Sequence, residues 1–281
     1  MKSGRPFVWF QHVLPQHTLS RLVLRATRVR APWFKNWLIR GFLRLYTIDM
    51  AEAVQPDPFR YASFNEFFTR ALKPGVRAIT GEPLEIACPV DGVISEAGNI
   101  DGDSLLQAKG RHYTLKELLA SQAWARDFEG GSFATIYLAP FNYHRVHMPL
   151  DGRLRETVYV PGRLFSVNAV TASLVPRLFA RNERVLTRFD TAFGEFALIL
   201  VGALNVGSIA TVWAGDIAPA PQRVVTTLPP HAVSLDKGEE LGRFNMGSTV
   251  ILLFQKDRAR WHSEVCAGAT VRLGQSLGCL Q

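Results

Sequence analysis

One stretch of 20 residues without a charged side chain, 196–215, restricts the folds open to this chain. A run of that length is long enough to cross a membrane as a helix. Glycine and asparagine residues interrupt it, however, and an acidic residue flanks it at each end. Two apolar segments, 196–201 and 206–213, separated by a short turn sequence, predict a hairpin of two buried strands instead.

Turn residues divide the chain from about residue 84 onward into short segments rich in β-branched residues. The turn signals are Asp-Gly and Pro-Gly pairs, at 91–92, 101–102, 151–152 and 161–162. Helical interruptions are predicted at 114–125 and 168–179. This pattern predicts an α+β fold, with a mainly antiparallel, sandwich- or barrel-like β core preceded by N-terminal amphipathic helices.

Positive charge is concentrated in residues 1–48, which hold nine Lys and Arg and no acid, whereas the whole 281-residue chain carries +8. Amphipathic helices are predicted over 15–30 and 33–46. Their aromatic and basic faces suit an anionic membrane surface, and would equally suit ordinary helices packed on a core. A third helix is predicted over 63–72, with Ser63 as N-cap in a capping box.

These patterns divide the chain into a basic, helical, membrane-associating segment, 1–60, and a catalytic β-rich domain, 61–281. The three cysteines form no C-x-x-C pair, which argues against a disulfide framework or a zinc site. No nucleic-acid partner is expected, because the bases are confined to one segment and no recognised binding motif is present.

Three short segments carry side chains suited to chemistry. Gly247 and Ser248 precede a strongly apolar strand. His144 and His147 would face opposite sides of a strand, which favours separate acid–base roles over a metal site. Asp91 could orient an imidazole, as the carboxylate of a triad does. Taken singly, each segment is equally compatible with a purely structural role.

In chain order, several longer segments resemble the phosphatidylserine decarboxylases of the bacterial and mitochondrial type. The segments are 64–70, 143–149, 159–168, 178–184 and 201–215. That family usually has Leu-Gly-Ser-Thr at its cleavage site, and this chain has Met246 in the Leu position. Met and Leu are similar in volume and polarity, so cleavage is expected to survive the difference.

The resemblance implies that the chain cuts itself between Gly247 and Ser248. The products would be a large chain, 1–247, and a small chain, 248–281, which stay associated. Ser248 would become a covalent pyruvoyl group, and no metal is expected. This cofactor would decarboxylate phosphatidylserine to phosphatidylethanolamine through a Schiff base, work that many enzymes assign to pyridoxal phosphate.

Residue roles also follow from the resemblance. His147, oriented by Asp91, would activate Ser248 for cleavage, and His144 would protonate the carbanion that decarboxylation leaves. A serine hydrolase with a lasting triad of Asp91, His147 and Ser248 is the main alternative, although the chain lacks a G-x-S-x-G elbow. A decarboxylase of a soluble amino acid and a non-catalytic basic protein are further alternatives.

Ser166 and Asn168 are expected to line the site for the lipid headgroup. The expected partners are phosphatidylserine, an anionic membrane surface and further copies of the chain in a homo-oligomer. The expected location is peripheral, on the cytoplasmic face of the cell membrane.

Overall fold

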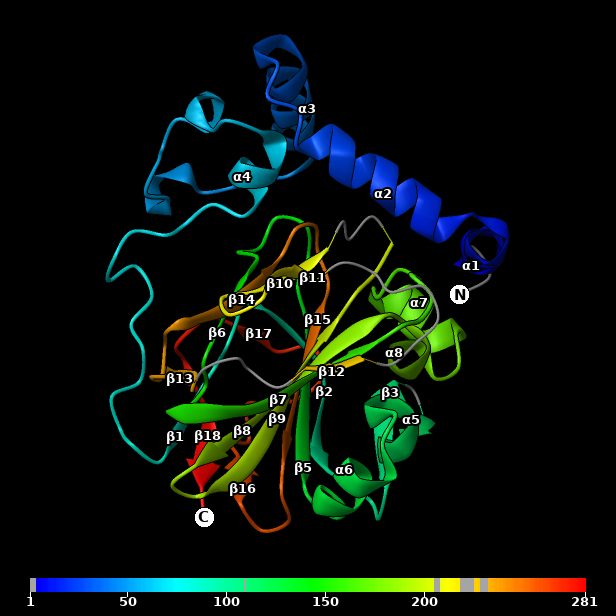
Figure 1. Ribbon diagram of the computed structural model, residues 1–281, viewed down its shortest axis with the longest axis vertical. Coiled ribbons are helices and arrows are strands. Elements are labelled where there is room, and N and C mark those ends of the chain that lie inside the picture. The colour runs from blue at the N-terminus through cyan, green and yellow to red at the C-terminus, as the bar shows by residue number, and fades with distance from the viewer. Residues whose placement is uncertain (1–3, 109, 205–207, 218–224, 228–231) are drawn as a thin grey trace.

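The computed structural model describes residues 4–108, 110–204, 208–217, 225–227 and 232–281. Its N-terminal helices lie over one end of a β-rich core, and shorter helices flank that core (Figure 1). The helices are α1 (Gly4–Val13), α2 (Gln16–Thr27), α3 (Pro32–Leu45), α4 (Phe64–Phe68), α5 (Leu115–Leu119), α6 (Gln122–Asp127), α7 (Ala169–Leu174) and α8 (Leu178–Arg181), with 3-10 turns η1 (Met50–Glu52) and η2 (Pro58–Arg60).

The named strands pair antiparallel throughout the described residues, which confirms the predicted α+β class. The strands are β1 (Glu85–Ala87), β2 (Gly92–Asn99), β3 (Ser104–Ala108), β4 (Arg111–Thr114), β5 (Ser132–Tyr137), β6 (Arg145–His147), β7 (Gly152–Val160), β8 (Arg184–Thr191), β9 (Gly194–Val201), β10 (Ile209–Thr211), β11 (Gly215–Ile217), β12 (Val225–Thr227), β13 (Ser234–Leu235), β14 (Glu240–Phe244), β15 (Thr249–Phe254), β16 (Ala259–Trp261), β17 (Thr270–Val271) and β18 (Ser276–Leu280).

Within the described residues, the largest sheet has nine strands, with the order β12-β7-β8-β9-β15-β5-β2-β17 and with β13 added on β7. Strand β15 lies inside it, paired over all six residues with β9 on one side and β5 on the other. All six side chains are buried, as expected for a continuous apolar run covered on both faces. The segment 247–248 therefore leads directly into an interior strand.

Three smaller sheets complete the core: β11-β10-β14-β6, β1-β18-β16 and β3-β4. The hairpin predicted over 196–215 is wrong in its pairing, although strands β9 and β10 both form. Strand β9 pairs with β8 and β15, whereas β10 pairs with β11 and β14 in another sheet. The pattern of apolar residues predicts that a strand is buried, but it does not predict which strand it pairs with. Residues 206 and 207 of the predicted second strand lie outside the described residues.

Helices α2 and α3 confirm the helices predicted over 15–30 and 33–46. The third predicted helix, 63–72, is wrong in extent, because α4 ends at Phe68 and Leu72 instead forms an extended bridge to Ala53. Ser63 does cap α4, accepting a hydrogen bond from the Glu66 N–H. The Glu66 carboxylate accepts from the Ala62 N–H, one residue before the expected partner.

Each of the two helical segments predicted within the core forms two short helices. Helices α5 and α6 fall within or beside 114–125, separated at Ala120, whose φ is +50°. Helices α7 and α8 occupy 168–179 and the two residues beyond. No helix within the described parts of the chain combines the length and apolar character needed to span a membrane.

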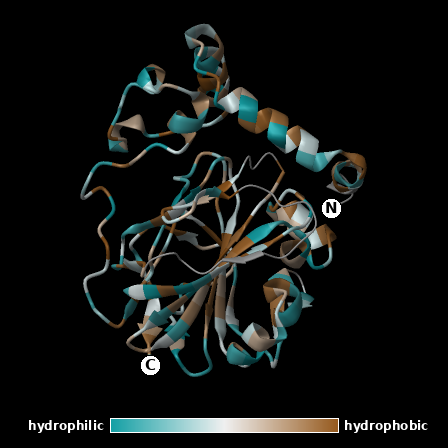
Figure 2. Cartoon of the chain, viewed as in Figure 1, coloured by the Kyte–Doolittle hydropathy of each residue, from teal (hydrophilic) through white to brown (hydrophobic). Residues whose placement is uncertain are grey.

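The N-terminal helices are bound to the core by buried polar side chains. Gln11 and Gln16 are both buried, and their side-chain oxygens accept hydrogen bonds from the N–H groups of Ser166 (2.7 Å) and Leu164 (2.9 Å). A small apolar cluster of Ile39, Phe64, Phe67 and Phe68 joins α3 to α4. Figure 2 shows hydrophobic residues recurring along α2 and α3, and some of them, such as Leu22, Trp33 and Trp37, are exposed.

Candidate active site

A cavity of about 280 Å³ lies beside Ser248. Its walls come from α3, from the loop before α7 and from the predicted cleavage segment, and they include Phe42, Tyr46, Ser166, Val167, Met246 and Gly247. Ser248 itself is 1% exposed, and its Oγ has no hydrogen-bond partner among the described residues. A buried hydroxyl without a partner is costly. Of the hydroxyls in this state among the described residues, that of Ser248 is the one beside the cavity, which makes it a candidate for chemistry.

The Gly247–Ser248 bond is supported unequally on its two sides. The Ser248 carbonyl accepts a hydrogen bond from the Leu138 N–H (2.9 Å), which extends the pairing of β15 with β5. At Gly247 a methyl group would lie 3.6 Å from Cε1 of His144 and 3.7 Å from the Leu138 carbonyl oxygen. Both are ordinary van der Waals distances, so a Cβ at Gly247 would not be crowded by the described residues.

His144 lies against Gly247 in a fully buried position. Its ring stacks on Phe68, with centroids 4.1 Å apart and planes 18° apart. Nε2 lies 3.2 Å from the Pro140 carbonyl oxygen, whereas Nδ1 has no partner among the described residues. Burial, reinforced by the nearby Arg70 guanidinium, lowers the pKa of His144 to about 3, although the Pro140 hydrogen bond opposes this shift. The imidazole is therefore neutral at neutral pH.

His147 is held at both ring nitrogens. Nδ1 lies 2.8 Å from the Gly238 carbonyl oxygen, so it carries the proton and donates. Nε2, 3.1 Å from the Tyr143 hydroxyl, then accepts. Burial lowers the pKa of His147 and raises the pKa of Tyr143 to about 12. The result is a neutral imidazole whose basic nitrogen is covered by a hydroxyl.

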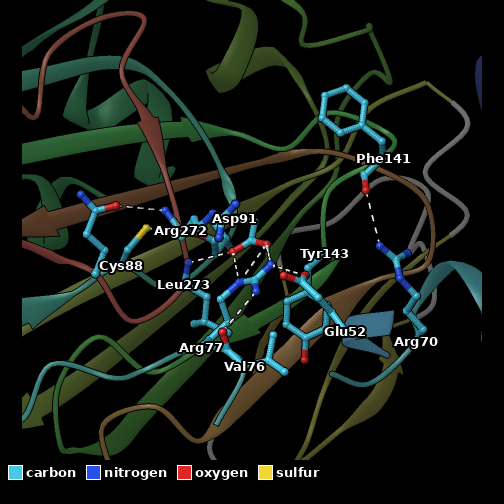
Figure 3. Close-up of polar contacts among 12 residues, drawn as sticks. Glu52, Arg70, Val76, Arg77, Cys88, Asp91, Phe141, Tyr143, Arg272 and Leu273 are labelled. Atoms are coloured by element: carbon cyan, nitrogen blue, oxygen red, sulfur yellow. Dashed lines mark hydrogen bonds and ion pairs between the residues drawn. The ribbon is translucent and has the colours of Figure 1, made fainter. Parts of the chain in front are cut away.

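Asp91 is bound to Arg77 rather than to an imidazole (Figure 3). Arg77 Nη2 and Nε lie 2.7 Å and 3.1 Å from its two carboxylate oxygens, and the Leu273 N–H donates at 2.8 Å. The same guanidinium binds Glu52 at 2.8 Å, and the Asp91 hydrogen bond in particular raises the pKa of Arg77. The next residue, Gly92, has no space for a side chain, because a Cβ there would lie 2.5 Å from the Tyr137 carbonyl oxygen.

The structure brings some of the predicted residues together and leaves others apart. His144, Gly247 and Ser248 meet at the cavity, with Ser166 on its wall. No hydrogen bond is found between Asp91 and His147, or between His147 and Ser248, in the described structure. Asn168 is not part of the cavity lining described for this site, and its Oδ1 caps α7 by accepting from the Thr171 N–H (3.0 Å).

Three residues around the site were missed from sequence: Phe68, Arg77 and Tyr143. Phe68 and Tyr143 lie inside the segments that carry the family resemblance, and an aromatic hydroxyl four residues before His147 was a usable signal. Arg77 offered none, because nothing in its spacing connects it to Asp91. No group of three or more His, Cys, Asp or Glu side chains is placed to hold a metal ion within the described ranges.

Comparisons with known proteins cover nearly the whole chain. The family described as phosphatidylserine decarboxylase matches residues 64–279, and a second description, PSD, matches residues 6–47. The phosphatidylserine decarboxylase proenzyme of Methylococcus capsulatus is 52% identical over 275 residues, covering 97% of this chain and 96% of that protein. The corresponding proenzyme of Azotobacter vinelandii is 50% identical over 283 residues, covering 98% of each.

Proposed function

The chain belongs to the phosphatidylserine decarboxylase family, and on that premise we propose which of its residues carry out self-cleavage and decarboxylation. It is a proenzyme that forms a pyruvoyl group and uses it to convert phosphatidylserine to phosphatidylethanolamine. The observation that carries the assignment of residues is the buried Ser248 Oγ beside Gly247, which finds no hydrogen-bond partner among the described residues.

In the proposed cleavage, Ser248 Oγ attacks the carbonyl carbon of Gly247 while His147 takes the hydroxyl proton. The Gly247–Ser248 amide breaks, leaving an ester on Oγ and a free amine at residue 248. Loss of the Cα proton then expels Gly247 as a carboxylate and leaves dehydroalanine. Addition of one water to its imine tautomer releases ammonia and leaves the pyruvoyl group on the small chain, 248–281.

This role for His147 requires three exchanges of partner. Its Nε2 must leave the Tyr143 hydroxyl to reach Ser248, and its Nδ1–H must leave the Gly238 carbonyl. The Asp91 carboxylate must turn from Arg77 to accept that N–H. Arg77 keeps Glu52 as an ion-pair partner when Asp91 leaves. The proposed triad is therefore assembled transiently, for one reaction, which distinguishes it from the lasting triad of a hydrolase.

The residues around Ser248 suit a group that reacts with an amine. The pyruvoyl group supplies a ketone for the substrate amine and a conjugated carbonyl that accepts the electron pair left when carbon dioxide departs. His144 is proposed to deliver the proton that replaces carbon dioxide. An anionic substrate in the cavity would oppose the effect of burial and raise the pKa of His144 toward neutrality. Ser166 is proposed to contact the headgroup, with Asn168 holding the loop by capping α7.

We propose that the two chains stay associated because the small chain supplies the interior strand β15 and also β16, β17 and β18. Strands β15, β17 and β18 pair with β1, β2, β5 and β9 of the large chain, and β16 pairs with β18. We also propose that residues 1–60 and 61–281 form separate parts of the chain and that the protein self-associates, which sedimentation velocity would test.

The membrane role proposed for residues 1–60 rests on their exposed aromatic side chains. Trp9, Trp33 and Trp37 face solvent on α1 and α3, beside arginines that would attract anionic lipid. Phe42 and Tyr46, in or just after α3, line the cavity at Ser248. Peripheral binding on the cytoplasmic face of the cell membrane would therefore place the cavity near its lipid substrate.

Intact mass spectrometry of the denatured protein tests the cleavage. We expect fragments 1–247 and 248–281, the small one lighter by one ammonia than a fragment beginning with serine. Ser248→Ala, Asp91→Asn and His147→Ala should leave one uncut chain, whereas His144→Ala should be cut and fail to release carbon dioxide. A single wild-type chain that reacts with fluorophosphonate would instead support the serine hydrolase alternative.

A further inference from the structure

The strand that ends just before the scissile bond is tied to the N-terminal helices through Asn245. This residue is 2% exposed and follows β14 directly. Its Oδ1 accepts a hydrogen bond from Asn65 Nδ2 in α4 (3.1 Å). Its Nδ2 donates to Ser208 Oγ (2.5 Å) and to Asp216 Oδ1 (2.9 Å). One amide thus joins α4, β11 and the residue that precedes β10.

Two further contacts extend this connection. Asp216 forms an ion pair with Arg28, the residue that caps α2 (2.5 Å). Met246, the next residue toward the scissile bond, packs against the apolar cluster shared by α3 and α4. Both residues that precede Gly247 are therefore held by side chains from the first 72 residues. On the other side of the bond, the backbone hydrogen bonds found among the described residues join Ser248 to Leu138 and β15 to the core strands β5 and β9.

This asymmetry matters for the geometry of attack. Strand pairing fixes the position of Ser248, but Gly247 has no side chain to hold it and two soft backbone dihedrals. The direction of its carbonyl group consequently depends on how residues 245 and 246 are anchored. An error of about 1 Å in the placement of reacting atoms can cost on the order of 100-fold in rate.

We propose that Asn245 is a positioning residue for self-cleavage, through which α4 and the end of α2 set the orientation of the Gly247 carbonyl. The inference rests on the cleavage proposed above. Asn245 touches neither reacting atom and acts only through the backbone that it anchors. The N-terminal helices are accordingly part of the maturation machinery, in addition to any role at a membrane.

The charges around Asn245 allow a specific test. Asp216 accepts from a neutral amide, so Asn245→Asp would set two carboxylates about 3 Å apart. The double variant Asn245→Asp with Asp216→Asn restores one carboxylate and one amide, with donor and acceptor exchanged. Asn245→Leu removes the hydrogen bonds at similar volume and introduces no charge.

The experiment follows cleavage of newly synthesised full-length protein by mass spectrometry between pH 5 and 8. We expect Asn245→Asp and Asn245→Leu to be cut at least about 10-fold more slowly than wild type at pH 8. The cleavage rate of Asn245→Asp relative to wild type should rise as the pH falls, because the facing carboxylates can then share a proton. The relative cleavage rate of Asn245→Leu should stay low over the same pH range. The double variant should be cut at least about threefold faster than Asn245→Asp, since one carboxylate again faces one amide. It should stay below the wild-type rate, because Asp216→Asn removes the ion pair with Arg28.

Equal cleavage rates in Asn245→Asp and wild type would overturn the inference, as would a double variant no faster than Asn245→Asp. Thermal unfolding of each substitution in a Ser248→Ala background measures folding separately. If cleavage slows only in proportion to the loss of folded protein, Asn245 has a structural role, and the inference would also be overturned. A wild-type chain that is never cut at 247–248 would instead refute the proposed function, so the two failures are distinguishable.

Discussion

The N-terminal helices and the β core differ in the exposure of their large apolar side chains. In the core, every residue of β15 is buried, as are most of the phenylalanines of the neighbouring strands. On the helices, Trp33 is 76% exposed and Trp37 is 65% exposed. The core gains its stability by burying its own apolar surface, whereas the helices retain apolar surface that only another phase or partner can cover.

The two regions are nevertheless joined at the reaction site. Gln11 and Gln16 hold the loop that carries Ser166, Phe68 stacks on His144, and Asn65 binds Asn245. Removing residues 1–48 would therefore take away part of the cavity wall along with the exposed tryptophans. Substitutions confined to exposed side chains separate the two roles more cleanly than truncation does.

The largest expected contrast is in stability. Leu252→Ala in β15 should lower the free energy of unfolding by about 2–5 kcal/mol, because it leaves a cavity in the interior of the sheet. Trp37→Ala should change it by less than about 0.5 kcal/mol. Urea unfolding in the uncut Ser248→Ala background measures both. Comparable losses in the two variants would show that α3 depends on Trp37 for its own packing.

The next effect concerns lipid binding. Replacing Trp9, Trp33 and Trp37 with Ser should weaken binding to vesicles that contain phosphatidylserine by roughly 100-fold, at about 1 kcal/mol for each partly inserted ring. Co-sedimentation with vesicles gives the affinity. Leu84→Ser, an exposed apolar residue next to β1, is the matched control and should bind as wild type does. Undiminished binding by the triple variant would assign the exposed rings to another partner.

A third effect appears where the regions meet, at His144. The folded protein keeps this imidazole unprotonated down to about pH 3, whereas the unfolded chain takes up the proton near pH 6.5. The free energy of unfolding should therefore fall as the pH drops through this window, by about 2 kcal/mol at pH 5 from this residue. Urea unfolding at pH 7.5 and at pH 5 measures the difference.

The contribution of His144 is separated by substitution in the same background. His144→Phe can keep the ring stacked on Phe68 but cannot titrate, so it should reduce the loss of stability between the two pH values. His112, exposed on β4, provides the control, and His112→Asn should leave that loss unchanged. An unchanged loss in His144→Phe would contradict the buried, neutral state of the imidazole.

The smallest effect is that of a single surface charge. Arg25 on α2 is exposed, and Arg25→Gln should cost about 1 kcal/mol of binding to anionic vesicles, or roughly fivefold in affinity. Binding to vesicles of uncharged lipid should not change. Arg260→Gln, in β16 at the opposite end of the molecule from the helices, is the control (Figure 1). Equal losses in both variants would indicate attraction by net charge alone.

Local features of the fold were predictable from sequence where their causes are local. The cap at Ser63 and the apolar run of β15 depend on neighbouring residues, and both are found as predicted. The strands with which β9 and β10 pair were not predictable, because a pattern of apolar residues indicates that a strand is buried but not which strand lies next to it. At the site, the residue types suited to the chemistry were recognisable, but their contacts were not. His147 bonds to Gly238, 91 positions away, and Asp91 bonds to Arg77.

The interior position of β15 has a consequence for how the protein comes into being. Before cleavage, the strand is placed by a chain that folds as one molecule, and the search for its neighbours is intramolecular. After the proposed cut, the same strand would belong to a 34-residue fragment, so that reassembly after denaturation would be a second-order reaction between two chains. The proposed cut would thus convert an equilibrium fold into one that persists through slow unfolding, and heat inactivation of the mature enzyme should then be irreversible in practice.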